Sequence, residues 1–192
     1  MMKVIGITGS IACGKSTVTD YLLKLGYQVV DSDKISREAL TKDLDCIFQV
    51  EQLFDCVENG KVDRKKLGRI IFHDEKAKKQ LEGIIHPYVI KKLKQAIQSC
   101  QDSVIFLDIP LLYESHLEYL CDEIMVVYLS EEKQLERLMK RDHIDQDYAR
   151  VIMNNQISIE EKKKRAQIII DNNGTIDQLY DQLNQFVKGL RK

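Results

Sequence analysis

The chain has 192 residues, of which 44% are hydrophobic and 31% charged, a composition that suits one globular domain with a sizeable core. Its 29 basic and 30 acidic residues nearly cancel, so no overall field attracts nucleic acid or an anionic membrane. No apolar run approaches the roughly 20 residues that span a bilayer, and the N-terminal apolar run is too short for a signal peptide. We therefore expect a cytoplasmic protein without a nucleic-acid or membrane partner.

The five cysteines are odd in number and widely spaced, and no C-x-x-C pair occurs. This pattern indicates neither a zinc ribbon nor a disulfide framework, so we expect reduced thiols. Cys13 differs from the others because it falls at the predicted N-terminus of a helix, where a thiolate is favoured. A redox role and a small space-filling side chain both fit Cys13.

Residues 9–17, GSIACGKST, match the pattern G-x-x-x-x-G-K-[ST] of a phosphate-binding P-loop. The apolar run 3–8 predicts a buried strand and residues 17–25 predict a helix, so the loop joins a strand to a helix start. Glycines let backbone N–H groups turn toward an anion, and the helix N-terminus adds partial positive charge. The predicted phosphate-binding residues are Gly9, Ser10, Ile11, Ala12, Cys13, Gly14, Lys15, Ser16 and Thr17.

Within this loop Lys15 would reach the β- and γ-phosphates of a nucleotide, and the Ser16 hydroxyl would hold Mg²⁺. The alternative is a glycine-punctuated turn that binds nothing.

Residues 27–30 predict a second strand, which ends at Asp31 and Asp33. In open parallel sheets ligands bind beyond the carboxyl ends of strands, so both carboxylates should reach the phosphate edge. Asp33 fits two roles, the N-cap of a helix over 34–40 and a catalytic carboxylate.

About seventy residues separate the second strand from a third at 103–108, far more than one crossover helix needs. Asp63 suits an N-cap and Pro87 suits the first position of a helix. The pattern predicts helices over 40–57, 63–72, 75–85 and 87–100. We interpret this region as an inserted helical lobe that holds a second substrate.

Asp108 ends the third strand beside the expected metal, where a carboxylate can order Mg²⁺ or its waters, or simply cap a loop. Leu111 and Leu112 follow at the expected mouth of the site and could contact substrate.

A fourth strand is predicted over 123–129, followed by a helix on which Arg137 and Arg141 lie one turn apart on one face. Two such guanidinium groups suit a phosphoryl group, although a solvated basic face is also possible. Further helices complete a small lid, and a fifth strand at 167–170 leads to a closing helix. Strands alternating with helices indicate an α/β fold, a parallel sheet with helices on both faces.

Taken together, the chain resembles the dephospho-CoA kinase family over essentially its full length. The resemblance rests on five stretches, which are residues 8–17, 31–33, 63–72 with His86-Pro87, 107–114 and 170–174. It implies transfer of the γ-phosphoryl group of ATP to the ribose 3′-hydroxyl of dephospho-CoA, with Mg²⁺, by a monomer. It also implies a nucleotide-kinase-like P-loop fold, with five parallel strands in the order 2-3-1-4-5. The implied parts are a core (1–33, 101–130 and 166–192), a helical acceptor insertion (34–100) and a lid (131–165).

The resemblance also implies residue roles. Asp33 would be the base facing the 3′-hydroxyl, Arg137 and Arg141 would cover the phosphates, and Asn172 would lie near the adenine of ATP. His86 would belong to the acceptor site, unless it is a core or helix-start histidine. The basic run Arg64, Lys65, Lys66 and Arg69 fits either the pyrophosphate arm of the acceptor or a solvated face.

The chain departs from the family pattern at three positions. Ser10 and Ala12 stand where the family usually has glycine, and we expect neither to be left-handed, because that conformation is costly for residues with a Cβ. Gln167 stands where an acidic residue is usual. Two other functions remain open, a P-loop kinase of another small nucleotide or nucleoside, and a nucleotide-binding switch protein. No N-K-x-D or T-K-x-D motif of a GTPase is present.

Overall fold

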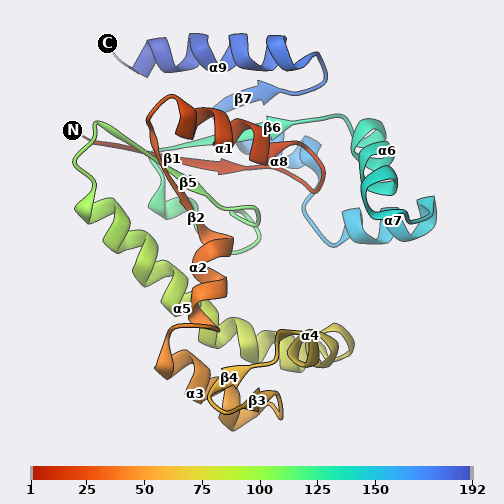
Figure 1. Cartoon of the computed structure of the whole chain (residues 1–192). Coiled ribbons are helices and arrows are strands. Elements are labelled where there is room, and N and C mark those ends of the chain that lie inside the picture. Colours follow the sequence, from red (N-terminus) through yellow and green to blue (C-terminus); the bar gives the residue numbers. More distant parts are fainter. Residues whose placement is uncertain (1, 191–192) are drawn as a thin grey trace. The chain divides into compact units, whose positions relative to one another are not determined.

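The computed structural model describes residues 2–190, and the chain divides into two compact units. The first unit consists of Met1–Val30 and Cys100–Lys192, and the second of Asp31–Ser99. The first carries the main sheet, and the second is mostly helical (Figure 1).

The main sheet has five strands in the order β2-β5-β1-β6-β7. Their bounds are β1 Lys3–Thr8, β2 Gln28–Asp31, β5 Val104–Asp108, β6 Glu123–Tyr128 and β7 Ile168–Asp171. The central strand β1 pairs in parallel with β5 and β6, and β6 pairs in parallel with β7. The predicted strand order is thus confirmed, and the carboxyl end of β1 leads directly into the P-loop.

Strands β1 and β5 are almost wholly buried, which explains why their sequences are continuous apolar runs instead of alternating ones.

The first-unit helices are α1 Lys15–Lys24, α6 Glu131–Asp142, α7 Gln146–Asn154, α8 Ile159–Arg165 and α9 Ile176–Leu190, with a short 3₁₀ helix at Glu118–Leu120. Helix α1 packs on α9, where the rings of Tyr21 and Tyr180 stack with centroids 4.1 Å apart. These helices bury the apolar core around Ile5, Phe106 and Met125.

The second unit contains α2 Ser32–Ala39, α3 Leu44–Leu53, α4 Arg64–His73 and α5 Glu75–Ser99, with a hairpin of β3 Val57–Glu58 and β4 Lys61–Val62. The predicted helix over 40–57 is therefore too long. Asn59 and Gly60 both take positive φ, 52° and 71°, and turn the chain back so that Val57 faces Val62. Asn-Gly is a strong hairpin signal in a sequence, and it outweighs the helical pattern here.

Helix α5 runs unbroken through Pro87, so the prediction of two helices that meet there is wrong. Proline lacks the N–H that would bond the carbonyl of Gly83, one turn earlier. The helix nevertheless continues because it has buried residues on both sides of Pro87, Ala77 and Leu81 before it and Val89 and Leu93 after it.

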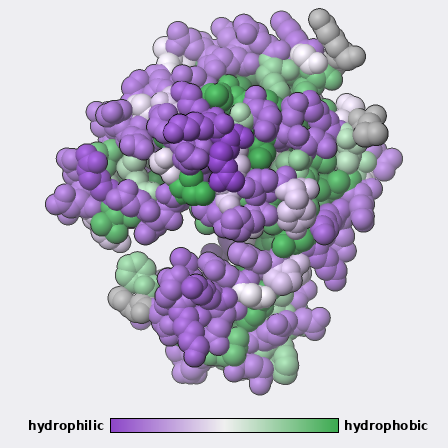
Figure 2. Space-filling model, turned by 180° about the vertical axis from the view of Figure 1, so that it is seen from behind, coloured by the Kyte–Doolittle hydropathy of each residue, from purple (hydrophilic) through white to green (hydrophobic). Residues whose placement is uncertain are grey.

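Within residues 2–190 no helix is both long enough and apolar enough to cross a membrane. Polar residues cover most of the face that Figure 2 shows, with small apolar areas between them.

Candidate active site

The P-loop joins β1 to α1 in a tight left-handed turn. Gly14 has a φ of 87° and precedes the first residue of α1, Lys15. Gly9 is buried, and a Cβ there would lie only 3.1 Å from the carbonyl oxygen of Val127. Both positions therefore require glycine, one for its conformation and one for lack of space.

Ala12 also takes a positive φ, 61°, so the expectation that it avoids the left-handed region is wrong, whereas Ser10 is outside that region as expected. The left-handed conformation raises the free energy of a residue with a Cβ by about 1 kcal/mol. Neighbouring hydrogen bonds hold the loop in place, because Ile11 N donates to Gln156 Oε1 at 2.9 Å and Ser10 Oγ donates to the Ile157 carbonyl at 3.3 Å.

Lys15 and Asp108 come together from α1 and the end of β5. Lys15 Nζ forms an ion pair with Asp108 Oδ1, and the two side chains retain only 18% and 9% of their exposure. The Ser16 hydroxyl belongs to the first turn of α1, where its residue is exposed. A hydroxyl and a carboxylate are oxygen ligands that suit Mg²⁺, which usually completes its shell with phosphate oxygens and water.

Cys13 lies in the apolar core beneath the loop and is only 2% exposed. Burial raises the pKa of its thiol, and the opposing N–H and charge of Lys15 do not compensate. The expected preference for a thiolate is therefore wrong, and Cys13 fills space under the P-loop.

Asn172 follows β7, and its side chain contacts the P-loop. Its Nδ2 donates to the Cys13 carbonyl at 2.8 Å, and its side chain packs against Gly14. The amide thus stabilises the phosphate-binding backbone, while the expected contact with adenine stays a prediction.

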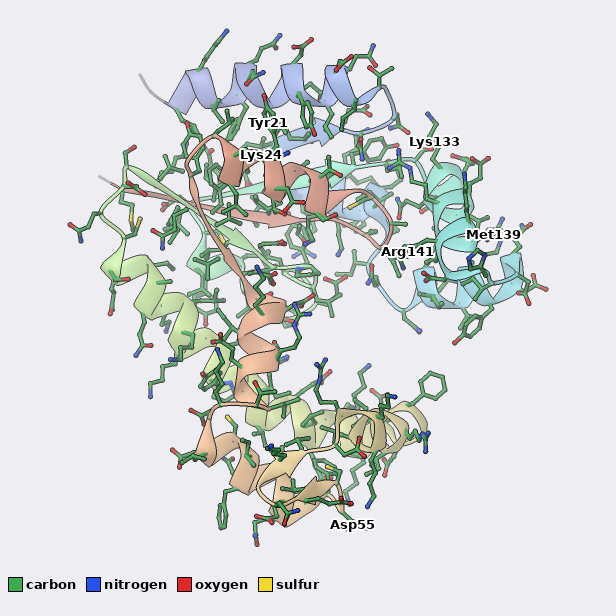
Figure 3. The ribbon with its side chains drawn as sticks, viewed as in Figure 1. Tyr21, Lys24, Asp55, Lys133, Met139 and Arg141 are labelled. Atoms are coloured by element: carbon green, nitrogen blue, oxygen red, sulfur yellow. The ribbon has the colours of Figure 1, made fainter. Side chains whose placement is uncertain are left out.

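The two arginines of α6, Arg137 and Arg141, have different partners. Arg137 reaches the P-loop, since its Nη1 lies 3.5 Å from the place that a Cβ on Gly14 would take. Arg141, one turn further along α6 (Figure 3), is bound to Asp142 through Nε at 2.7 Å and Nη2 at 2.9 Å. The Asp142 carboxylate also raises the pKa of Arg141. The structure therefore brings Arg137, but not Arg141, to the loop.

Leu111 and Leu112 have opposite environments. Leu111 is 42% exposed, whereas Leu112 is completely buried and packs toward Gly6 of β1. Leu112 is therefore a core residue, and its expected contact with substrate is wrong.

The remaining predicted residues lie in the second unit. Asp31 is the N-cap of α2, since its Oδ1 accepts from the N–H groups of Asp33 and Lys34 at 2.8 and 3.0 Å. The cap role suggested for Asp33 is thus wrong, and its carboxylate is exposed in the first turn of α2. His86 is exposed on α5, so it is neither a core nor a helix-start histidine.

The basic run on α4 divides into two groups. Lys66 pairs with Asp55 at 3.1 Å. The other three basic residues line a shallow cavity of about 370 Å³, whose lining is Arg64, Lys65, Gly68, Arg69 and Phe72.

Sequence reasoning missed Lys162, a fully buried lysine on α8. Its Nζ contacts Glu114 Oε1 at 2.9 Å and the carbonyl oxygens of Gly9 and Pro110 at 3.3 and 3.2 Å. It lies in the charged run EEKKKR, which resembles a solvated face. The available signal was its spacing, because Ile159 precedes it by three residues on the same buried face.

A cavity of about 470 Å³ lies between the P-loop and α6, α7 and the start of α8. Ser10 lines it on the loop side, and Leu135, Met139 and Met153 line it on the helix side.

A glycine loop between a buried parallel strand and a helix, with Lys15 and Asp108 together at its mouth, defines a P-loop nucleotide-binding protein. The family model for dephospho-CoA kinase matches residues 3–178. The chain is 43% identical to the dephospho-CoA kinase of Bacillus licheniformis, over 97% of this chain and 96% of that one. The chain therefore belongs to the dephospho-CoA kinase family.

Two solved structures are similar to this chain in both sequence and fold. Dephospho-CoA kinase from Campylobacter jejuni is 31% identical with a TM-score of 0.77, over 98% of this chain and 96% of that one. A protein from Thermus thermophilus is 32% identical with a TM-score of 0.84, and 98% of each chain is covered.

Proposed function

We propose that this protein transfers the γ-phosphoryl group of ATP to the ribose 3′-hydroxyl of dephospho-CoA, giving coenzyme A and ADP. The observation that carries the proposal is the family match over residues 3–178, combined with a formed P-loop whose lysine meets the strand-end Asp108. The balanced charge of the chain supports a cytoplasmic enzyme without a nucleic-acid or membrane partner, and we propose a monomer.

Phosphoryl transfer needs alignment and charge stabilisation more than covalent chemistry from the protein. The N–H groups of the P-loop and the start of α1 hold the phosphates, and Lys15 neutralises charge on the β- and γ-phosphates. Arg137 adds a second cation at the loop. Ser16 and Asp108 would hold Mg²⁺, which when bound offsets negative charge on the phosphate oxygens.

For the acceptor, we propose that Asp33 orients the 3′-hydroxyl and takes its proton, and that His86 and the second unit contribute to acceptor binding. The exposed, uncommitted position of the Asp33 carboxylate supports this role, because the neighbouring Asp31 already caps the helix. Segment 131–165 acts as a lid that excludes water and so limits ATP hydrolysis.

The test measures ADP release from ATP and Mg²⁺ with dephospho-CoA, adenosine and the common nucleoside monophosphates as acceptors. We expect rapid release with dephospho-CoA alone. Turnover with a nucleoside or nucleotide instead would indicate another small-molecule kinase. Nucleotide binding without acceptor-dependent release would indicate a switch protein.

Replacement Arg141→Ala should lower kcat on the order of 10²-fold, with a smaller rise in the KM for ATP. The reason is that Arg141 is held by Asp142 in the present structure and would meet the phosphates only after the lid rearranges. Steady-state kinetics check this, with the exposed neighbour Lys140→Ala as the control on the same helix. A variant that raises only the KM for ATP would make Arg141 a ground-state contact.

A further inference from the structure

The environment of Lys162 differs from that of an ordinary surface lysine of a charged helix. Its side chain has no exposed area, and its ammonium lies near three oxygen atoms, those of the Gly9 and Pro110 carbonyls and Glu114 Oε1. An ammonium group has three N–H donors, so every donor has a partner within the protein. Lys162 therefore has no donor left for a phosphate and acts through the groups it holds.

Two of the three partners belong to the parts of the chain that form the phosphate site. Gly9 opens the P-loop, and Pro110 follows Asp108 by two residues. The Pro110 carbonyl also accepts from Thr8 Oγ1 at 2.9 Å, which ties the end of β1 to the end of β5. Lys162 thus joins the two strand ends that carry the Lys15–Asp108 pair.

The third partner, Glu114, connects this point to the base of the lid. Glu114 Oε1 also accepts from Ile157 N at 3.0 Å, in the connection between α7 and α8. Its other carboxylate oxygen is buried and has no hydrogen-bond partner within the described part of the chain. Gln156, which precedes Ile157, also accepts a hydrogen bond from Ile11 N in the P-loop. The base of the lid and the P-loop are therefore connected at two points.

A buried ion pair is a weak source of stability, because well-packed apolar residues of similar volume often serve as well or better. Its value lies in fixing one geometry. We infer that Lys162 is a positioning residue, which holds the Gly9 and Pro110 carbonyls and the lid base in one arrangement and thereby aligns Lys15 with Asp108. This role rests on the proposed phosphoryl transfer and adds a residue that does not touch substrate.

The experiment uses the double replacement Lys162→Met with Glu114→Gln, which removes both charges of the ion pair and nearly keeps the side-chain volumes. A single Lys162→Met would leave the mostly buried Glu114 carboxylate without its cation, and could fail to fold. The control is Arg165→Met, which removes a cation from the same helix one turn later. Arg165 pairs with Glu118 and lies over the ring of Tyr113, 4.0 Å from its centroid, and within residues 2–190 its side chain forms no hydrogen bond or ion pair with the P-loop.

We expect the double variant to melt within a few degrees of the unchanged protein while kcat falls at least about thirtyfold and the KM for ATP rises less. Amide hydrogen exchange should quicken in the peptide covering residues 8–17. Arg165→Met should leave kcat and this exchange near their normal values. Unchanged kcat and exchange in the double variant would overturn the inference, as would equal losses in Arg165→Met.

The exchange measurement also separates this inference from the proposed function. An unchanged protein that does not phosphorylate dephospho-CoA would refute the proposed function. Faster exchange confined to the loop of the double variant would still support Lys162 as the residue that positions it.

Discussion

Replacement of Lys15 by alanine is expected to lower kcat by roughly 10³-fold or more, because it removes the cation that stabilises charge on the transferred phosphoryl group. The control is Lys24→Ala, which removes an exposed lysine from the last turn of the same helix (Figure 3). Near-normal turnover of Lys15→Ala at saturating ATP would contradict the whole assignment of the site.

The structure adds a stability effect to this prediction. Lys15 is largely buried against Asp108, so Lys15→Ala leaves a mostly buried carboxylate without its cation. The cost should be about 1–3 kcal/mol in the free energy of unfolding. The double replacement Lys15→Ala with Asp108→Asn should recover part of that stability without recovering activity. Melting curves and rates measured on the same preparations would distinguish lost chemistry from lost folding.

Replacement of Asp33 by asparagine is expected to lower kcat with dephospho-CoA at least tenfold, at or somewhat below the lower end of the ~10²–10⁴ that a positioned general base contributes. The effect is modest because the acceptor proton leaves late in a loose transition state. ATP affinity should change little. The melting temperature should also change little, because Asp31, and not Asp33, caps α2.

A matched control exists one helix further along the chain. Asp45 occupies the same position in α3 as Asp33 does in α2, an exposed acid in the first turn behind an aspartate cap. Asp45→Asn loses the same interaction with the helix dipole, worth about 0.3–1 kcal/mol, without approaching the proposed chemistry. A normal rate in both variants would leave Asp33 as an ordinary surface carboxylate.

The sheet and the phosphate loop could be predicted from the sequence because local signals determine them. Continuous apolar runs mark buried parallel strands, and the order of strand, glycine loop and helix leaves little freedom at the P-loop. The position of Asp108 at a strand end, beside Lys15, follows from the same logic. These features depend on residues adjacent in sequence, or on the carboxyl ends of parallel strands, which lie at the same edge of the sheet.

The over-long helix over 40–57 and the cap assigned to Asp33 were misread local signals, but several other errors arose where contacts distant in sequence decided the outcome. Ala12 is left-handed in a loop whose neighbouring residues bond Gln156 and Ile157, far along the chain, and no local pattern shows such contacts. Pro87 remains inside α5 because buried residues on both sides of it hold the helix in place. Lys162 stands in a run of charged residues, so the sequence does not indicate that it is buried against the Gly9 carbonyl. Leu112 follows the predicted site in the sequence, and only the structure shows that it packs against Gly6.

The order of the strands along the chain has a consequence for biosynthesis. The central strand β1 is translated early, but its partners β5 and β6 begin only at Val104 and Glu123. The second unit, Asp31–Ser99, is continuous and can collapse while the ribosome is still adding residues. The main sheet of the first unit can form only after β5 and β6 have been translated, and such non-local strand pairing is slow. During that interval the nascent P-loop segment has no sheet to hold it, so chaperone dependence should concentrate in this half of the protein.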